Sequence, residues 1–241
     1  MKYSFLIPYS RRALHLQNTL VSYRHFYGPR DDFEIIIAED AKNADDDAEH
    51  SKLMRLLRKF KDLNIKHLIN YSEEGYNPAP AFNFAARSSL GKFLILTNPE
   101  CFHLTNMLKG FDAHFKKNWQ CYVICSCQDV RWPNKALESF GDFSYTFISW
   151  YQHSVLLPRG LHFCSALSRD NYDKLGGFDE DFKKGIARED VDFIERVKRS
   201  GVVVIEDDSL QVAHLNHQRL YQNNPGLLEV NKQVYNRKWS S

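Results

Sequence analysis

The stretch Phe33-Glu34-Ile35-Ile36-Ile37-Ala38-Glu39-Asp40 determines which fold class the sequence favours. Its apolar part is continuous and rich in β-branched residues, too apolar for a strand that exposes one face to water. Such a run is typical of a parallel strand that is covered on both faces. The run stops at two carboxylates, which places charged side chains at the carboxyl end of the expected strand.

Similar runs recur through the first half of the chain and alternate with helical patterns. Further strands are expected at 4–7, 65–69 and 93–96. Apolar residues recur at the three- and four-residue spacing of an amphipathic helix in the intervening and following segments. These expected helices are 13–27, 53–60, a short one from Pro80 through Ala86, and 104–115. Strands separated by helices in this order predict βαβ units, and hence an α/β fold with a mainly parallel central sheet.

The second half has a weaker pattern. Helices are expected at 169–175 and 189–201, and a strand at 202–205, whereas residues 128–160 are expected to form long loops. A polar tail is expected to run to the end of the chain. Because there is no internal repeat, low-complexity tract or obvious linker, the sequence predicts a single domain over residues 1–241.

Composition excludes several classes of protein. The 241 residues are 43% hydrophobic and 26% charged, with a formal net charge of +2, so nothing calls for a nucleic-acid partner. No stretch approaches the ~20 apolar residues of a membrane span, and the first residues lack the pattern of a signal peptide. We therefore expect a cytoplasmic protein without a transmembrane segment.

The five cysteines favour reduced thiols over disulfides because their number is odd. Cys121, Cys125 and Cys127 have a spacing that invites a zinc interpretation. However, they lie in an apolar run without a neighbouring histidine. We expect them to be small buried side chains of a strand.

Polar residues follow three of the expected strands. They are Pro8-Tyr9-Ser10, Glu39-Asp40 and Asn98-Pro99-Glu100. Because ligands bind at the carboxyl ends of the strands in open α/β sheets, these groups are expected to share one edge and form a site. From the residues alone, alternatives stay open: Asp40 as a helix cap, 98–100 as a proline-containing turn, and Glu189-Asp190 as charges that complement a helix N-terminus.

Five segments, taken in order, resemble the family 2 glycosyltransferases of the inverting GT-A superfamily. The segments are the opening strand to Ile7-Pro8-Tyr9, then 34–40, 91–100, Gly176-Gly177-Phe178-Asp179-Glu180, and Glu189-Asp190-Val191-Asp192. The resemblance covers nearly the whole chain. It implies a GT-A fold in which 1–100 is the nucleotide-binding half and 101–241 is the acceptor-binding and catalytic half.

The resemblance also implies roles for individual residues. The nucleotide would be bound by Pro8, Tyr9, Ser10, Asp40, Asn83 and Asn98. A divalent ion, Mn²⁺ or Mg²⁺, would be held by Glu100, Asn98 and His214, with His217 as the alternative histidine. Asp190 would be the catalytic base, oriented by Glu189, and Trp150, His153 and Gly177 would contact the acceptor.

Two departures from the family pattern bear on these roles. Asn98 stands where the family usually has the first aspartate of Asp-x-Asp, which leaves one carboxylate fewer for the metal. Asn83 matches the asparagine of the family's Arg-Asn-x-Gly segment, but the arginine and the glycine are absent.

The expected activity is metal-dependent, inverting transfer of a sugar from a nucleotide diphosphate sugar, with a UDP-sugar favoured, to a hydroxyl of a glycan or glycoconjugate. Peripheral membrane association stays open, because an acceptor can be lipid-linked. One alternative is a catalytically inactive GT-A-like protein that binds a nucleotide or a glycan, which Asn98 motivates. Another is a nucleotidyltransferase, which is disfavoured because Arg11-Arg12, rather than a glycine-rich phosphate loop, follows the first strand.

Overall fold

The computed structural model describes residues 1–71, 77–218 and 224–240. Its strands are β1 (Tyr3–Tyr9), β2 (Phe33–Asp40), β3 (Ile65–Asn70), β4 (Phe93–Thr97), β5 (Cys101–His103), β6 (Cys121–Arg131), β7 (Thr146–Gln152), β8 (Cys164–Ser168) and β9 (Val203–Leu215). Its helices are α1 (Ala13–Tyr27), α2 (Ala41–Ala44), α3 (Asp47–Lys59), α4 (Pro78–Arg87), α5 (Met107–Lys117), α6 (Arg169–Lys174), α7 (Glu189–Arg199) and α9 (Pro225–Trp239). Two 3-10 turns are η1 (Phe140–Asp142) and η2 (Glu180–Lys184).

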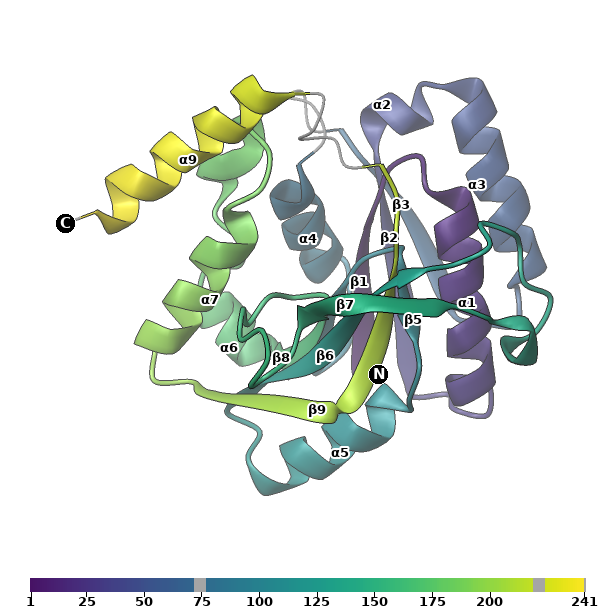
Figure 1. The fold of residues 1–241 in the computed structure, drawn as a ribbon, viewed down its shortest axis with the longest axis horizontal. Helices are drawn as coiled ribbons and strands as arrows, with labels where there is room; N and C mark the ends of the chain where they lie inside the picture. Colours follow the sequence, from purple (N-terminus) through teal and green to yellow (C-terminus); the bar gives the residue numbers. More distant parts are fainter. Residues whose placement is uncertain (72–76, 219–223, 241) are drawn as a thin grey trace.

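All strands join one mixed sheet in the order β3-β2-β1-β4-β8-β6-β9-β5, and β7 pairs with β6 (Figure 1). The four strands of the first half run parallel to one another, as the sequence predicts. In the second half β8 is antiparallel to both β4 and β6, while β6 and β9 are parallel. The chain therefore has the predicted α/β architecture, with antiparallel pairs confined to the second half and its junction with the first.

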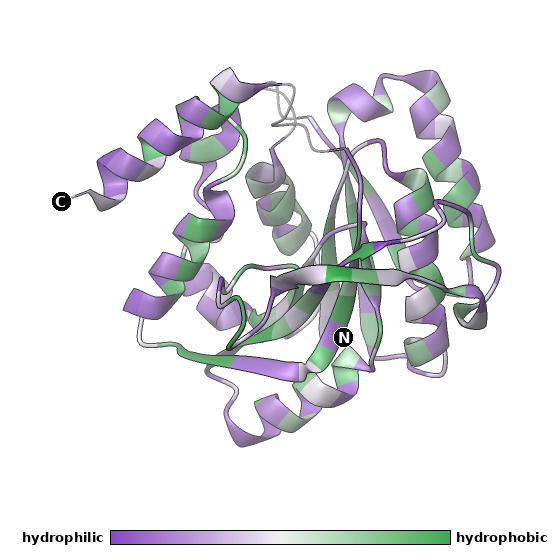
Figure 2. Ribbon diagram, in the orientation of Figure 1, coloured by the Kyte–Doolittle hydropathy of each residue, from purple (hydrophilic) through white to green (hydrophobic). Residues whose placement is uncertain are grey.

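Two hydrophobic cores cover the two faces of the sheet. Because successive side chains of a strand point to opposite faces, Phe5 and Ile7 of β1 enter one core and Leu6 enters the other. The first core is completed by α1, α3 and α5, and the second by α4, α6 and α7. Figure 2 shows apolar residues concentrated along the central strands, with hydrophilic residues spread over the helices. Burial on both faces explains the continuous apolar runs of β1, β2 and β4.

The structure corrects the sequence prediction between residues 128 and 160, where β6 continues to Arg131 and β7 covers Thr146–Gln152 instead of long loops. Phe147 and Ile148 of β7 are about half exposed, so this strand lacks the alternation that identifies a half-buried strand. The short strands β5 and β8 also lie outside the predicted set.

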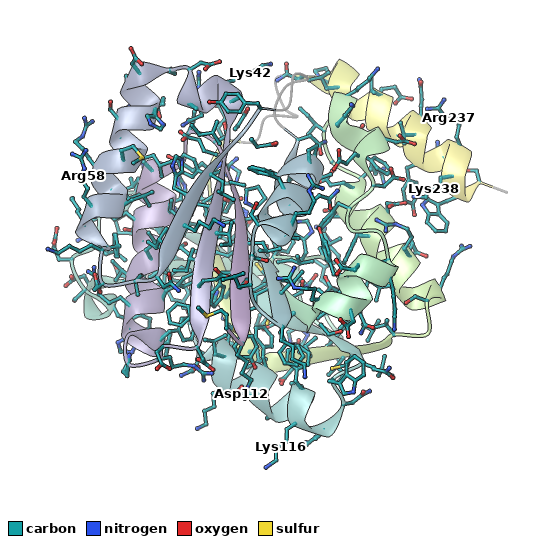
Figure 3. The ribbon with its side chains drawn as sticks, turned by 180° about the vertical axis from the view of Figure 1, so that it is seen from behind. Lys42, Arg58, Asp112, Lys116, Arg237 and Lys238 are labelled. Carbon is teal, nitrogen blue, oxygen red and sulfur yellow. The ribbon has the colours of Figure 1, made fainter. Side chains whose placement is uncertain are left out.

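The predicted polar tail is wrong as well, because it contains helix α9. Asn231 is the buried residue of this helix, so no apolar stripe announces it. Near its end, Lys238 pairs with Asp192 of α7 at 2.7 Å, and the indole N–H of Trp239 donates to the same carboxylate at 3.0 Å. Figure 3 labels Arg237 and Lys238 on these last turns. Polar contacts with α7 therefore hold the described end of the chain.

All five cysteines are buried and free, as expected, and the three in β6 are side chains of a strand. Within residues 1–71, 77–218 and 224–240, no helix combines the length and apolar character needed to cross a bilayer.

Candidate functional site

A cavity of about 200 Å³ opens at the carboxyl edge of the parallel strands. Segments far apart in the sequence meet there: residues after β1, residues after β4, the turn before α7, and residues at the end of β9. Seven of the residues predicted from sequence line it, namely Ser10, Asn98, Glu100, Glu189, Asp190, His214 and the alternative histidine His217. Polar groups after β1 and β4 therefore meet at one edge of the sheet, together with the Glu-Asp pair of α7, whereas Glu39 and Asp40 do not line this cavity; that these residues form a ligand site stays a prediction.

Glu100, His214 and His217 form a compact group on one side of this cavity. The His217 Nε2 atom lies 3.4 Å from Glu100 Oε1, and His214 Nε2 lies 3.9 Å from the same oxygen. The pairing of β5 with β9 sets this arrangement, because Cys101 stands opposite His214 and the Leu215 amide donates to the Glu100 carbonyl at 2.9 Å. Carboxylate and imidazole ligands converge here from two adjacent strands.

These residues fit a divalent cation. One ligand atom from each lies within 4.8 Å of the others, and Glu100 Oε2 is buried without a hydrogen-bond partner. Burial lowers the pKa of His214, which favours the neutral imidazole that ligates metals. Burial opposes ionisation of Glu100, but Arg12 and the two histidines together hold its pKa well below the usual value. The site therefore offers one carboxylate and two imidazoles, while Asn98 contributes an amide in place of a second carboxylate.

Arg12 is a site residue that the sequence analysis did not select. Its guanidinium lies 3.3 Å from Glu100 Oε1, and it lines the same cavity. A strongly basic side chain directly after the first strand is the available signal, because strand ends carry the site in this class of fold. A fixed positive charge beside Glu100 is suited to receive an anionic ligand such as a diphosphate.

Glu189 and Asp190 face this group from the first turn of α7. The preceding residues Ala187 and Arg188 have φ values of 63° and 76°, a left-handed conformation that is strained for side-chain-bearing residues. Asn231 of α9 stabilises the turn by donating to the Ala187 carbonyl at 2.7 Å. Strain of this kind, held by surrounding structure, is characteristic of functional sites.

The two carboxyl groups have different surroundings. Glu189 is buried, and burial together with the neighbouring Asp190 raises its pKa to about 8. Its Oε2 atom has no hydrogen-bond partner. Asp190 lines the cavity and accepts a hydrogen bond from the Val191 amide at 2.7 Å. A protonated Glu189 beside a cavity-lining Asp190 is an arrangement in which two adjacent acids hold different roles at neutral pH.

Asn83 and Gly177 lie together in a different, larger cavity of about 600 Å³. The Asn83 amide donates to the Phe178 carbonyl and to Glu180, both at 2.8 Å, and accepts from the Tyr172 hydroxyl and the Phe178 amide. All four of its hydrogen-bonding positions are therefore used within the protein. Gly177 has φ +69°, and a Cβ there would collide with the Asn83 carbonyl oxygen. Both residues fasten the Gly-Gly-Phe segment to α4 away from the Glu100 cavity, and ligand binding by either stays a prediction.

Trp150 and His153 are also absent from the cavity lining, whereas Tyr151 is present. Because consecutive side chains of a strand point to opposite faces, Trp150 and Tyr151 cannot share a face of β7. Trp150 packs edge-on against His153 at 4.5 Å between ring centroids, and His153 pairs with Asp208 at 3.5 Å. Tyr151 is therefore the aromatic side chain of β7 that lines this cavity, and acceptor contact by Trp150 and His153 stays a prediction.

Pro8, Tyr9 and Asp40 sit at the ends of β1 and β2, beside rather than within the cavity lining. Asp40 accepts a hydrogen bond from the Lys42 amide at 3.1 Å and caps α2, as the helix-cap alternative predicts. Burial raises the pKa of Asp40. The cap uses Oδ1, so nucleotide binding by Asp40 stays a prediction.

Comparison with known proteins gives a fold but no sequence relative. No protein-family model matches the chain, and no curated protein matches it in sequence. Solved structures match it closely in three dimensions. TarS 1-349 of S. aureus in complex with UDP-GlcNAc superimposes with a TM-score of 0.68 at 12% identity, over 97% of this chain and 65% of that one. The fold is that of the GT-A glycosyltransferases.

Two other structures support this assignment. The mannosyltransferase PcManGT from Pyrobaculum calidifontis, in complex with GDP-Man and Mn²⁺, has a TM-score of 0.65 at 16% identity, over 92% of this chain and 59% of that one. GalNAc-T7 with UDP, GalNAc and Mn²⁺ has a TM-score of 0.64 at 15% identity, over 90% of this chain and 44% of that one. This chain thus spans about two thirds or less of the structures it resembles.

Proposed function

We propose that this chain transfers a sugar from a nucleotide diphosphate sugar to a hydroxyl of a glycan or glycoconjugate, with inversion at the anomeric carbon and with a divalent metal ion. The observation that carries the proposal is the cavity of the GT-A fold, in which the Glu100-His214-His217 group faces Glu189 and Asp190. Cation ligands on one side and a carboxylate base on the other are the two requirements of this displacement.

Glu100, His214 and His217 would hold Mn²⁺ or Mg²⁺, with Asn98 beside them. The bound metal supplies positive charge that stabilises the departing diphosphate. Arg12 contributes to the same end, because its guanidinium already lies in the cavity next to Glu100. Asn98 stands where the family usually has an aspartate, so the metal here would have one carboxylate ligand fewer. We infer that the positive charge of Arg12 supplies part of the stabilisation of the departing diphosphate that this difference removes.

Asp190 would accept the proton of the acceptor hydroxyl as the new glycosidic bond forms. Protonated Glu189 would hold its position next to Asp190 without adding a second negative charge. Tyr151 and His162 line the same cavity and are placed to contact a sugar ring. Single displacement by an acceptor activated in this way inverts the configuration at the anomeric carbon.

Residues 1–100 would bind the nucleotide, with Asp40, Pro8, Tyr9 and Ser10 close to the base and its ribose. A UDP-sugar is favoured because two of the three similar structures, TarS and GalNAc-T7, are complexes with UDP or a UDP-sugar. Residues 101–241 would then supply the catalytic and acceptor-binding side of a single GT-A domain. Cytoplasmic localisation, and peripheral contact with a membrane through the acceptor, remain expectations from the sequence.

The test is release of nucleoside diphosphate from a panel of UDP- and GDP-sugars, with Mn²⁺, Mg²⁺ or EDTA and with mixed glycan acceptors. We expect release from one donor that stops with EDTA and falls by about 10²–10⁴-fold in D190N. D173N is the matched control, because Asp173 lines the other cavity and its substitution is expected to leave turnover unchanged. Equal release by wild type and D190N would contradict the proposal.

A second function is a nucleotide- or glycan-binding protein without turnover. The observation that favours it is that Glu100 already has a cationic partner in Arg12 while Asn98 replaces a carboxylate, which together weaken the demand for a metal. Saturable UDP binding with no release across all donors and acceptors would support it.

A further inference from the structure

A second group of metal-ligating side chains lies at the β2 and β3 side of the sheet, outside the cavity. Glu39 is the last residue but one of β2, His67 lies on β3 and His50 lies on α3. Glu39 Oε2 is 2.9 Å from His50 Nδ1 and 2.7 Å from His67 Nε2. One ligand atom from each of the three lies within 4.8 Å of the others.

The strand register explains why these groups meet. Glu39 of β2 stands opposite Tyr9 of β1, and Ile37 of β2 stands opposite His67 of β3. Because Ile37 and Glu39 are two residues apart, they point to the same face, and His67 and Tyr9 share that face. This is the face that α3 covers, so His50 approaches from above.

Glu39 is a buried carboxylate whose environment lacks a conventional cationic partner. Its side chain is 0% exposed. Asn43 donates to Oε1, and the two imidazoles take Oε2. In the described part of the chain, no lysine or arginine forms an ion pair with it. A buried carboxylate is stable when it is paired or coordinates a metal.

A second, independent observation points to a ligand at this place. The Tyr9 hydroxyl is fully buried and has no hydrogen-bond partner of good geometry, although the Arg12 amide lies near it. The charge of Glu39 acts on this hydroxyl more strongly than that of any other group. Buried hydroxyls are normally hydrogen-bonded, so this one is placed to meet a group such as a water molecule on a bound ion.

We propose that Glu39, His50 and His67 form a zinc site that fastens α3 to the edge of β2 and β3. Two imidazole nitrogens and one carboxylate oxygen suit Zn²⁺ here, because neither an Asn98 amide nor a diphosphate adds the further oxygen ligands that Mn²⁺ or Mg²⁺ would have beside Glu100. A tetrahedral ion with bonds of about 2.1 Å separates its ligand atoms by about 3.4 Å. The oxygen–nitrogen distances of 2.7 and 2.9 Å are shorter than that spacing by about 0.5–0.7 Å, so the three side chains, whose ligand atoms lie within 4.8 Å of one another, would move apart slightly to admit the ion. A water molecule would complete the fourth position.

None of the ligands of this site lines the cavity of Glu100, so its metal binding can be tested apart from turnover, although Tyr9 also belongs to the proposed nucleotide-binding side. Its tests accordingly use metal binding and thermal stability rather than turnover. Because the Glu100 group has the same ligand types, the experiment must separate the two.

Zn²⁺ affinity is measured by isothermal titration, and Co²⁺ absorption is recorded as a spectroscopic probe, for wild type, H67Q, H50Q and E100Q. We expect H67Q and H50Q each to weaken the zinc affinity of the tightest site by at least about 100-fold, since even loss of an outer-shell partner lowers metal affinity 10–100-fold. E100Q is expected to keep that site. Saturating Zn²⁺ should raise the Tm of wild type and E100Q by about 5–10 °C, and that of H67Q by much less.

H114Q is the matched control, because His114 forms a comparable pair with Asp207 at 2.7 Å but belongs to neither three-ligand group. It should bind zinc as wild type does. Circular dichroism checks folding; if H67Q does not fold, H50Q on the half-exposed face of α3 carries the test. Zinc binding that is unchanged in both H67Q and H50Q, or that is lost in E100Q alone, would overturn the proposal.

Discussion

Replacing Glu189 by glutamine tests the description of the two carboxyl groups in the cavity. Burial and Asp190 raise the pKa of Glu189 from 4.5 to about 8 in the folded protein. The folded state therefore binds a proton that the unfolded state has already lost between these two values. Stability tied to Glu189 is fully present below pH 4.5 and is lost as the pH rises toward 8.

The magnitude follows from the size of the shift. Each pKa unit corresponds to about 1.4 kcal/mol, so the full effect is about 5 kcal/mol as an upper value. Glutamine resembles the protonated acid in shape and carries no charge, so E189Q should escape this loss. The difference in free energy of unfolding between E189Q and wild type should grow in favour of E189Q by about 2.5 kcal/mol from pH 5.5 to 7.5.

Chemical denaturation at pH 5.5, 6.5 and 7.5 measures this difference. The free energy of unfolding of D190N should depend less on pH than that of wild type, because Asp190 contributes to the raised pKa of Glu189. E195Q, on the same helix with a side chain 30% exposed and paired with Lys198, should follow the wild-type dependence. A difference between E189Q and wild type that stays constant within about 0.5 kcal/mol across these pH values would refute the reasoning.

Three further predictions concern the neighbouring elements. G177A should destabilise the protein by about 2–4 kcal/mol in denaturation experiments, because the added Cβ would collide with Asn83. G176A also places alanine at a positive φ but in open space, so it should cost about 1 kcal/mol. Equal losses of stability in the two variants would exclude the collision. N98D should tighten Mn²⁺ binding by about tenfold, measured by titration, since it adds a carboxylate ligand, and an unchanged affinity would remove Asn98 from the metal site. R12Q should weaken UDP binding by about tenfold or more in the same assay through loss of a charged hydrogen bond; wild-type affinity would exclude that role.

Much of the first half of the fold was predictable, because β1, β2 and β4 are buried on both faces and have the composition that such burial requires. The secondary structure of the second half was harder to predict from the sequence. β7 exposes Phe147 and Ile148 and therefore shows no periodic pattern, and α9 buries Asn231 rather than an apolar stripe. Sequence patterns report burial, so elements held by edge pairing or polar contacts escape them.

The candidate site divides in the same way. Glu100 lies between β4 and β5, Asp190 is in the first turn of α7 and His214 is the last residue but one of β9, so their positions could be inferred from strand and helix ends. Arg12 was missed because its importance depends on its distance to Glu100 across the cavity, which no local pattern contains. Tyr151 was missed because a single-residue difference in strand position decides which aromatic faces the cavity.

Asn83 shows the limit of inference from a resemblance. It occupies the matching position in the sequence, yet its amide is saturated by contacts with Tyr172, Phe178 and Glu180. Those partners lie about 90 to 97 positions away, so only the folded chain reveals that the residue is committed to structure.

The central claim is that the Glu100 group holds a metal ion together with the nucleotide. The most direct test is Mn²⁺ binding followed by electron paramagnetic resonance, with and without UDP, in wild type and E100Q. We predict that wild-type protein removes the signal of free Mn²⁺, that UDP strengthens this binding, and that E100Q abolishes both effects. Mn²⁺ binding by E100Q that equals wild type and responds equally to UDP would contradict the account.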